Sequence, residues 1–292
     1  NNEIIKGVVI SIIRDFKSNY IIKKILDNQN KNVIFTKKQI KFFKWAEEYY
    51  LLNLSKIFHT IIPNNILEIT NNSNIKNQKD NKEIDNNLKE LNKFDTYLIK
   101  DLTINYTDLI YRYIKNDKNS KNQFLILTPN IYYSFEIYKR LKLIYKNQCC
   151  VYNSKISLKE KQKNWINIIN NKIRIIIGVK SAIFLPFNNL KLSIVLNEHE
   201  NLYKENEKKL RYNARDCSVM LTKIYNSKTI LVSETPSIES YYNVQKRKYG
   251  YINNTKNNYK INLKKILTIN TVEKKIKNKI YGLISDDLIK KI

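Results

Sequence analysis

Two groups of side chains have the chemistry to contact a nucleic acid. Lys180 and Ser181 closely follow an apolar run that ends at Gly178, and an ammonium group and a hydroxyl can both donate hydrogen bonds to phosphate oxygens. Downstream, tyrosines and arginines occur together, and both can stack on single-stranded bases. These residues are Tyr203, Arg211, Tyr212 and Arg215. An ordinary helix start with surface charges uses the same residue types, so both interpretations stay open.

The sequence contains no comparable motif for binding a nucleotide or a metal ion. A phosphate-binding loop needs glycines whose backbone N–H groups surround phosphates, followed by Lys and by Ser or Thr. The four glycines do not form this pattern; they are Gly7, Gly178, Gly250 and Gly282. The three cysteines and two histidines lack the spacing of metal ligands, so we expect no metal site.

The chain is strongly basic. Its 292 residues carry 53 Lys and Arg against 26 Asp and Glu, which gives a formal net charge of +27. Clustered cations neutralise phosphates and release counterions, so DNA is one candidate partner. However, Lys, Asn, Ile and Tyr are abundant while Ala, Gly and Pro are scarce, which is the pattern that adenine- and thymine-rich codons produce. A lysine-rich surface that arose by codon drift is an equal alternative.

Composition also limits the class of protein. A hydrophobic fraction of 42% is enough for a core and argues against wholesale disorder. No apolar run is long enough to span a membrane, and the sparse cysteines fit a reducing, cytoplasmic setting. The chain begins Asn1-Asn2, with no methionine or signal peptide, so we expect it to be a piece of a longer product.

The first third of the chain predicts small elements. Residues 1–25 alternate apolar and polar side chains, which predicts short strands around a polar turn. Thr36 with Gln39 is a helix start signal, and two short helices follow that end at Pro63. Two short helices after a strand suggest a small winged-helix-like module. Residues 70–93 are almost free of apolar side chains and predict a linker.

From residue 94 onward, apolar runs alternate with helical patterns. The predicted strands are 97–99, 124–127, 150–152, 173–177, 192–196 and 229–232. The predicted helices are 107–114, 131–145, 158–169 and 214–225. Buried strands joined by helices predict an α/β fold with a parallel sheet covered on both faces. In such sheets, chemistry takes place at the carboxyl ends of the strands.

The segments at those strand ends resemble a known family. The most specific one is Gly178-Val179-Lys180-Ser181-Ala182-Ile183-Phe184-Leu185-Pro186-Phe187, where the family has G-T-R-S-A-L-F-x-P-F. The others are segments 127–131, 194–200, 211–216 and 233–240, in the family's order. Together they resemble the primosomal protein N′ (PriA) family, the replication-restart DNA helicases of superfamily 2.

The resemblance implies a domain order. It implies a RecA-like helicase lobe at residues 94–244, preceded by a winged-helix-like domain at 26–69 and the linker at 70–93. Residues 1–25 resemble the end of the N-terminal domain that holds the 3′ end of a strand, and 245–292 a basic connector to a second lobe. The chain then resembles an internal slice of the family, without most of the 3′-binding domain, the zinc-containing insert and the second lobe.

The ATP-binding loop of the family aligns with residues that cannot do its work. Asn105 stands where a glycine is expected, and Tyr106 stands where the phosphate lysine is expected. Thr107 alone remains as a possible Mg²⁺ hydroxyl. ATP and Mg²⁺ are therefore cofactors of the family, whereas we expect no cofactor in this chain.

The D-E-E-H box of the family, which holds the metal and polarises water, aligns with residues 196–199. Leu196 and Asn197 replace its first two acidic positions, and Glu198 and His199 remain as a catalytic remnant. These losses predict that the chain does not hydrolyse ATP. Thr235 and Ser237 match the motif that couples ATP state to DNA, although the end of a strand and a helix cap alone would explain these residue types.

The resemblance predicts a PriA-like primosomal protein that acts in replication restart and binds forked or single-stranded DNA. Lys180, Ser181 and the tyrosine and arginine group are its expected DNA contacts, and other primosome or single-strand-binding proteins are further expected partners. The alternative is a decaying helicase remnant with only non-specific DNA binding. An active helicase completed by another chain is disfavoured, because that chain would have to replace a backbone phosphate cradle.

Overall fold

The computed structural model describes most of the chain between residues 35 and 253. The described residues are 17, 19, 21, 35–63, 66, 91, 93–101, 105–115, 117, 119, 121–206, 210–253, 280–281 and 284–285. The chain forms two compact units, residues 1–255 and 256–292. In the second unit, β10 (Ile280–Tyr281) pairs antiparallel with β11 (Ile284–Ser285). Among the described helices, none has the length and apolar character that crossing a membrane requires.

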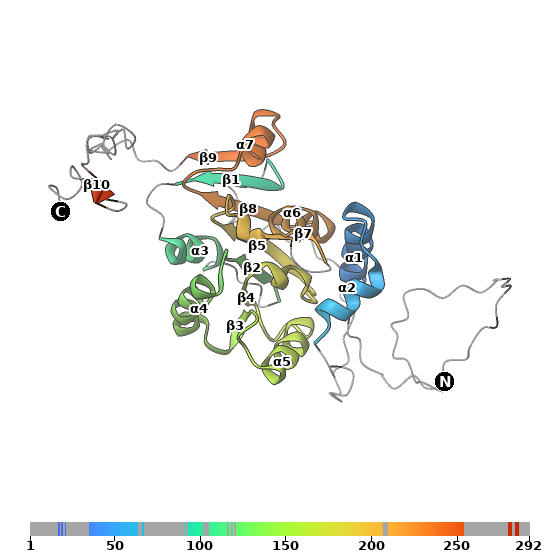
Figure 1. Cartoon of the computed structure of the whole chain (residues 1–292). Helices are drawn as coiled ribbons and strands as arrows, with labels where there is room; N and C mark the ends of the chain where they lie inside the picture. Colours follow the sequence, from blue (N-terminus) through green and yellow to red (C-terminus); the bar gives the residue numbers. More distant parts are fainter. Residues whose placement is uncertain are drawn as a thin grey trace. The chain divides into compact units, whose positions relative to one another are not determined.

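A seven-stranded sheet organises the first unit (Figure 1). Its strands are β1 (Thr96–Lys100), β2 (Gln123–Leu127), β3 (Cys149–Tyr152), β4 (Ile175–Gly178), β5 (Leu190–Leu196), β8 (Lys228–Ser233) and β9 (Gly250–Asn253). Their order is β3-β4-β2-β5-β8-β1-β9, and every pairing is parallel. The central strands are almost entirely buried because both faces of the sheet are covered. The predicted parallel α/β fold is confirmed.

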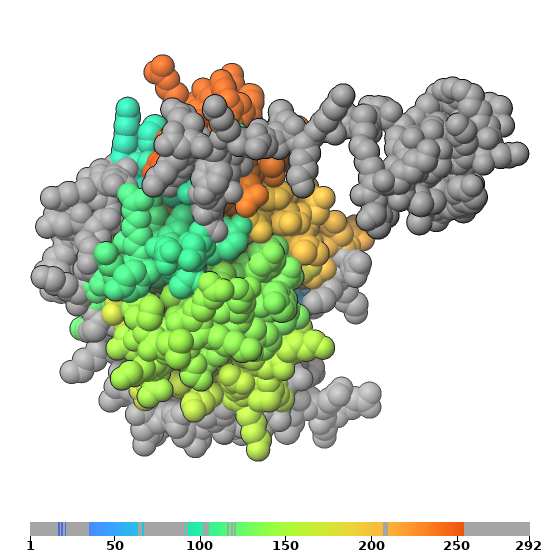
Figure 2. All heavy atoms as spheres, turned by 90° about the vertical axis from the view of Figure 1, so that its left-hand side faces the viewer, coloured from blue at the N-terminus to red at the C-terminus, as the bar shows by residue number. Residues whose placement is uncertain are grey.

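Helices cover the two faces of this sheet. They are α1 (Lys37–Tyr49), α2 (Leu54–Ile61), α3 (Tyr106–Ile114), α4 (Ile131–Tyr145), α5 (Leu158–Ile169), α6 (Ala214–Tyr225) and α7 (Ile238–Gln245). Helices α3 and α4 lie side by side on one face (Figure 2), where Ile110 and Leu141 enter the core. Helices α1, α5 and α6 bury Phe42, Trp165 and Leu221 in the core of the other face.

Short elements complete the unit. They are the 3-10 turns η3 (Lys146–Gln148), η4 (Lys180–Phe184) and η5 (Asn201–Tyr203), and the antiparallel strands β6 (Lys204–Glu205) and β7 (Tyr212–Asn213). Turn η4 continues directly from the end of β4 and carries Lys180 and Ser181. Turns η4 and η5 follow the carboxyl ends of β4 and β5, whereas η3 precedes β3.

Helix α1 packs against α6, on the same face of the sheet (Figure 1). Thr36 caps it by accepting a hydrogen bond from the backbone N–H of Gln39 at 3.1 Å, as the sequence predicts. The Gln39 side chain donates to the carbonyl of Phe184 at 2.8 Å. Phe42 and Phe43 are fully buried, with ring centroids 5.8 and 6.2 Å from that of Phe184. The first two helices therefore share one core with the sheet.

The predicted domain boundaries are only partly covered by the described residues. Between residues 35 and 66, the described part contains two helices and no strand, so the winged-helix prediction is not confirmed. The strands predicted in residues 1–25 and the linker predicted at 70–93 fall almost wholly outside the described residues. The boundaries themselves stay predictions.

Candidate functional site

The predicted site segments lie at one edge of the sheet. Because the paired strands are all parallel, the residues that follow them meet at the carboxyl edge. Those segments are 128–130, 179–181, 197–199 and 234–235, after β2, β4, β5 and β8. These segments therefore follow parallel strands along one edge of the sheet.

Tyr106 and Asn197 occupy the two expected ATP positions and bind each other. Tyr106 opens α3, and its hydroxyl donates a hydrogen bond to Oδ1 of Asn197, directly after β5. Asn105 caps the same helix, because its Oδ1 accepts from the backbone N–H of Thr107 at 3.1 Å. A phosphate at a helix N-terminus would need such an N–H group. The rest of the aligned loop, residues 102–104, lies outside the described residues.

The charges around Tyr106 are negative. Burial raises the pKa of its phenol to about 12, and the carboxylates of Glu234 and Glu200 act in the same direction. The phenol is therefore neutral at physiological pH. A neutral hydroxyl near two carboxylates attracts a polyphosphate far less than the lysine expected at this position would.

Glu198 is the centre of a buried hydrogen-bond network. Its residue is 1% exposed, and its carboxylate accepts four hydrogen bonds. The donors are the Ser237 N–H at 2.7 Å, Ser237 Oγ at 2.9 Å, Ser240 Oγ at 2.8 Å and Arg215 Nη1 at 3.2 Å. Every donor comes from α6 or from the start of α7. The geometry makes Glu198 a structural junction between β5, α6 and α7.

His199 links the ends of two strands. Its Nδ1 lies 2.7 Å from Ser233 Oγ at the end of β8, and that oxygen accepts from the Thr235 N–H at 3.0 Å. Ser237 caps α7 by accepting from the Ser240 N–H at 3.2 Å. The capping alternative for Ser237 is thus present in the structure, while Thr235 is exposed.

Lys180 is partly neutralised by a neighbouring carboxylate. Its Nζ lies 3.1 Å from Oε2 of the buried Glu205 and donates to the Lys204 carbonyl at 3.4 Å. Ser181 and Arg211 are exposed and remain accessible to a phosphate backbone. Among the predicted DNA contacts, these two side chains are the most accessible to a ligand.

The other three predicted DNA contacts are buried, so we correct their expected role. Tyr203 is 1% exposed, and its hydroxyl donates to the carbonyls of Leu127 at 3.0 Å and Leu196 at 2.5 Å. Tyr212 packs edge-on against Phe184. Arg215 is buried and paired with Glu198 and with Asp216 at 2.9 Å. In this conformation none of the three presents a face on which a base could stack.

Some relationships at the site have no signal in the sequence. No pattern identifies Asn197 as the partner of Tyr106, or Ser240 as a donor to Glu198. The three cysteines are buried, and burial raises the pKa of the Cys149 thiol to about 12. Within the part of the chain that the structure describes, no three His, Cys, Asp or Glu side chains gather where they could hold a metal ion.

Comparisons with known proteins place this chain beside one family. The 3′ DNA-binding domain of PriA matches residues 1–63, a span that includes α1 and α2. The replication restart protein PriA of Rickettsia prowazekii is 31% identical over 295 residues, which cover 96% of this chain and 45% of the relative. PriA of Rickettsia typhi is 29% identical and covers 99% of this chain and 46% of the relative. PriA of Chlamydia muridarum is 34% identical over 158 residues, or 54% of this chain and 21% of the relative.

The chain spans less than half the length of these Rickettsia relatives. Among solved structures, RecG bound to a three-way DNA junction is 16% identical and aligns with 74% of this chain and 28% of its own, with a TM-score of 0.42. Mss116p bound to single-stranded RNA is 15% identical and aligns with 56% of this chain and 37% of its own, with a TM-score of 0.41.

Proposed function

Because the chain is PriA-like along nearly its whole length, we propose that it acts in DNA replication restart by binding branched or single-stranded DNA. The observation that carries this proposal is the match over 96% of the chain, together with the 3′ DNA-binding domain match at residues 1–63. The net charge of +27 supports phosphate contact. Other primosome or single-strand-binding proteins are further proposed partners.

We also propose that the chain binds DNA without hydrolysing ATP. The PriA family consists of DNA helicases, and their motor needs a phosphate lysine, a metal-binding Asp and a water-polarising Glu. Tyr106, Leu196 and Asn197 stand at those positions. Each lost group removes several kcal/mol of transition-state stabilisation. The hydrogen bond between Tyr106 and Asn197 and the Asn105 cap support this proposal.

A decaying remnant with non-specific DNA binding is the second candidate. It is favoured by the loss of polar motor groups, because relaxed selection on ATP use would leave that pattern. Against it, the central strands are almost entirely buried, and the side-chain caps at Thr36, Ser157 and Ser237 are all in place. A fold without selection would accumulate defects in such features.

Fork preference separates the two candidates. The purified chain is titrated onto forked and plain duplex DNA of equal length at two salt concentrations, with ATP turnover measured on both. We expect tighter binding to the fork that persists at the higher salt, and no turnover above background. Equal binding to both DNAs that falls steeply with salt would support the remnant, because charge alone produces that behaviour.

A further inference from the structure

Helix α7 has few apolar contacts with the rest of its unit. Only Ser240 of its eight residues is buried, and Val244 is its one apolar side chain packed against the core. Its other apolar side chains, Ile238, Tyr241 and Tyr242, are 87%, 47% and 55% exposed. Local opening costs least where few apolar contacts must break. Helix α7 is therefore an element with two accessible arrangements, docked and open, and polar contacts decide between them.

The buried carboxylate of Glu198 is the polar anchor of α7. It accepts hydrogen bonds from the Ser237 N–H at 2.7 Å and from Ser240 Oγ at 2.8 Å. Arg215 Nη1 donates to the same carboxylate at 3.2 Å and to Ser237 Oγ at 2.8 Å. The side chains of Arg215 and Glu198 are only 8% and 0% exposed, and hydrogen bonds are stronger where water is excluded. The position of the Arg215 guanidinium thus sets how firmly α7 is docked.

Arg215 is itself positioned from the side of α1. Its Nε donates to Asp216 Oδ1 at 2.9 Å, and Asp216 Oδ2 accepts from Asn213 Nδ2 at 2.9 Å. The Asn213 N–H donates to the hydroxyl of Tyr50 at 3.3 Å, and this hydroxyl donates to the Asn213 carbonyl at 3.4 Å. Tyr50 is the residue that ends α1. An unbroken series of polar contacts, the Tyr50–Glu198 path, therefore runs from α1 to α7.

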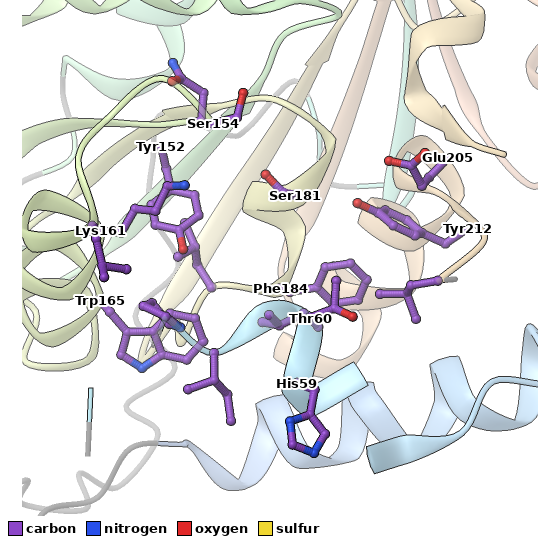
Figure 3. A pocket seen from close by; sticks show the side chains of 17 residues that line it. His59, Thr60, Tyr152, Ser154, Lys161, Trp165, Ser181, Phe184, Glu205 and Tyr212 are labelled. Atoms are coloured by element: carbon purple, nitrogen blue, oxygen red, sulfur yellow. The ribbon is translucent and has the colours of Figure 1, made fainter. Parts of the chain in front are cut away.

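Strand β7 separates this path from a cavity on its other side. Tyr212 and Asn213 form β7, and successive side chains of a strand point to opposite sides. Figure 3 shows the ring of Tyr212 at the wall of a cavity of about 310 Å³, whose lining does not include Asn213. Tyr212 thus fixes β7 against the core, while Asn213 on the opposite side contacts Tyr50 and Asp216.

We propose that the Tyr50–Glu198 path couples α1 to α7, so that DNA bound by the span that contains α1 keeps α7 docked. The proposal rests on the proposed function for its ligand, because residues 1–63 match a 3′ DNA-binding domain. A polar network transmits a change when an element with two arrangements lies at its end. DNA that orders α1 reduces the freedom of the Tyr50 hydroxyl and, through Asn213 and Asp216, that of Arg215.

Hydrogen exchange without DNA tests the path itself. The reporters are the backbone N–H groups of Tyr241 and Lys246, which donate to carbonyls within α7 and exchange when it opens. We expect Tyr50→Phe to accelerate their exchange by about two- to tenfold, the range that loss of one hydrogen bond produces. Exchange in α4, which lies outside the path, should not change. Asp216→Asn interrupts the middle of the path and gives the answer if Tyr50→Phe destabilises the fold.

Tyr225→Phe is the matched control. The hydroxyl of Tyr225 also links α1 to α6, because it lies 3.2 Å from Thr36 Oγ1 and donates to the Phe187 carbonyl at 2.6 Å. Tyr225 ends α6, whereas Arg215 lies in its first turn, so this contact is outside the path. We expect no acceleration in α7. The proposal is overturned if Tyr50→Phe leaves α7 exchange unchanged, or if Tyr225→Phe accelerates it equally.

Exchange with the forked DNA then tests the DNA step. At equal DNA occupancy, measured by fluorescence anisotropy, we expect slower α7 exchange in the wild type and a smaller response in Tyr50→Phe. Bound DNA without any slowing of α7 would retain the proposed function and overturn the coupling to DNA. A chain that binds no DNA would lose the proposed function, while acceleration by Tyr50→Phe without DNA would still support the coupling of α1 to α7.

Discussion

The hydroxyl of Tyr106 donates a hydrogen bond to Oδ1 of Asn197. The two residues come from the start of α3 and the end of β5, and they stand where the resemblance to the helicase family expects a phosphate lysine and a catalytic glutamate. A lysine would bind the phosphates of ATP and a glutamate would polarise water, whereas a phenol and an amide form a hydrogen bond with each other. Tyr106 and Asn197 thus join the start of α3 to the end of β5.

Removal of this hydroxyl tests the structural role. We expect Tyr106→Phe to lower the free energy of unfolding by about 0.5–1.5 kcal/mol, because the Asn197 amide oxygen loses its donor. Urea denaturation of both proteins measures the difference. The control is Tyr132→Phe, a 75% exposed tyrosine on α4, which should change stability by less than about 0.5 kcal/mol.

The difference in unfolding free energy between the wild type and Tyr106→Phe should depend on pH. The phenol of Tyr106 has its pKa raised from 10.0 to about 12 in the folded state, so the folded chain holds this proton more tightly. Its stabilising contribution is complete below pH 10 and is lost as pH rises through about 12. The wild type minus Tyr106→Phe difference should therefore shrink between these values. A difference that stays constant across this range would show that the pKa is not raised.

Glu198 should matter for stability and not for chemistry. We expect Glu198→Gln to lower the free energy of unfolding by about 1.5–3 kcal/mol, because hydrogen bonds to a charged, buried carboxylate are strong and Arg215 loses one of its partners. Arg215 keeps Asp216, which limits the cost. Hydrogen exchange should also show faster opening of α7, since Ser237 and Ser240 are held by this carboxylate.

Glu200→Gln is the matched control for Glu198. Glu200 follows the same strand but is only half-buried, and its carboxylate lies 4.0 Å from His199 Nε2. We expect a change within about 0.5 kcal/mol. Equal costs for both substitutions would contradict the role assigned to the buried network.

The sequence predicted the sheet and its helices well because strands that are buried on both faces consist of consecutive apolar residues, which are easy to recognise. Ile126 and Ile176 belong to such runs, and Thr36 and Ser237 mark helix starts by local capping chemistry. Local patterns cannot show the environment of one polar residue. The sequence predicted Tyr203 as a stacking residue. Its hydroxyl instead donates to the carbonyl of Leu196, seven residues earlier in the chain, and to that of Leu127, which is distant in sequence.

Glu205 should control how much Lys180 contributes to DNA binding. The two charges lie 3.1 Å apart, so the carboxylate competes with any phosphate for the ammonium group. We expect Glu205→Gln to free this cation, tighten single-stranded DNA binding and steepen the log–log salt dependence by about 0.7. Lys180→Gln added to this variant should abolish the gain. An unchanged salt dependence in Glu205→Gln would place Lys180 outside the DNA contact.

Finally, α1 should unfold together with the lobe. A separate module at residues 26–69 would have its own core, but Phe35 packs edge-on against Trp165 of α5 at 6.0 Å, and Phe42 contacts Phe184. The chain has two tryptophans, Trp45 on α1 and Trp165 on α5, so single-tryptophan variants report on each side of this shared core. Shared burial couples their unfolding into one cooperative transition.

In urea, the fluorescence midpoint of Trp165→Phe, which reports on α1, should coincide with that variant's own far-ultraviolet circular dichroism midpoint. The midpoint of Trp45→Phe, which reports on α5, should do the same. Comparison within each variant removes the cost of the substitution itself, which differs because Trp165 is fully buried and Trp45 is half-buried. If the Trp45 signal changed at lower urea than the circular dichroism, α1 would unfold on its own. The first two helices would then form a separate domain, as the sequence predicts.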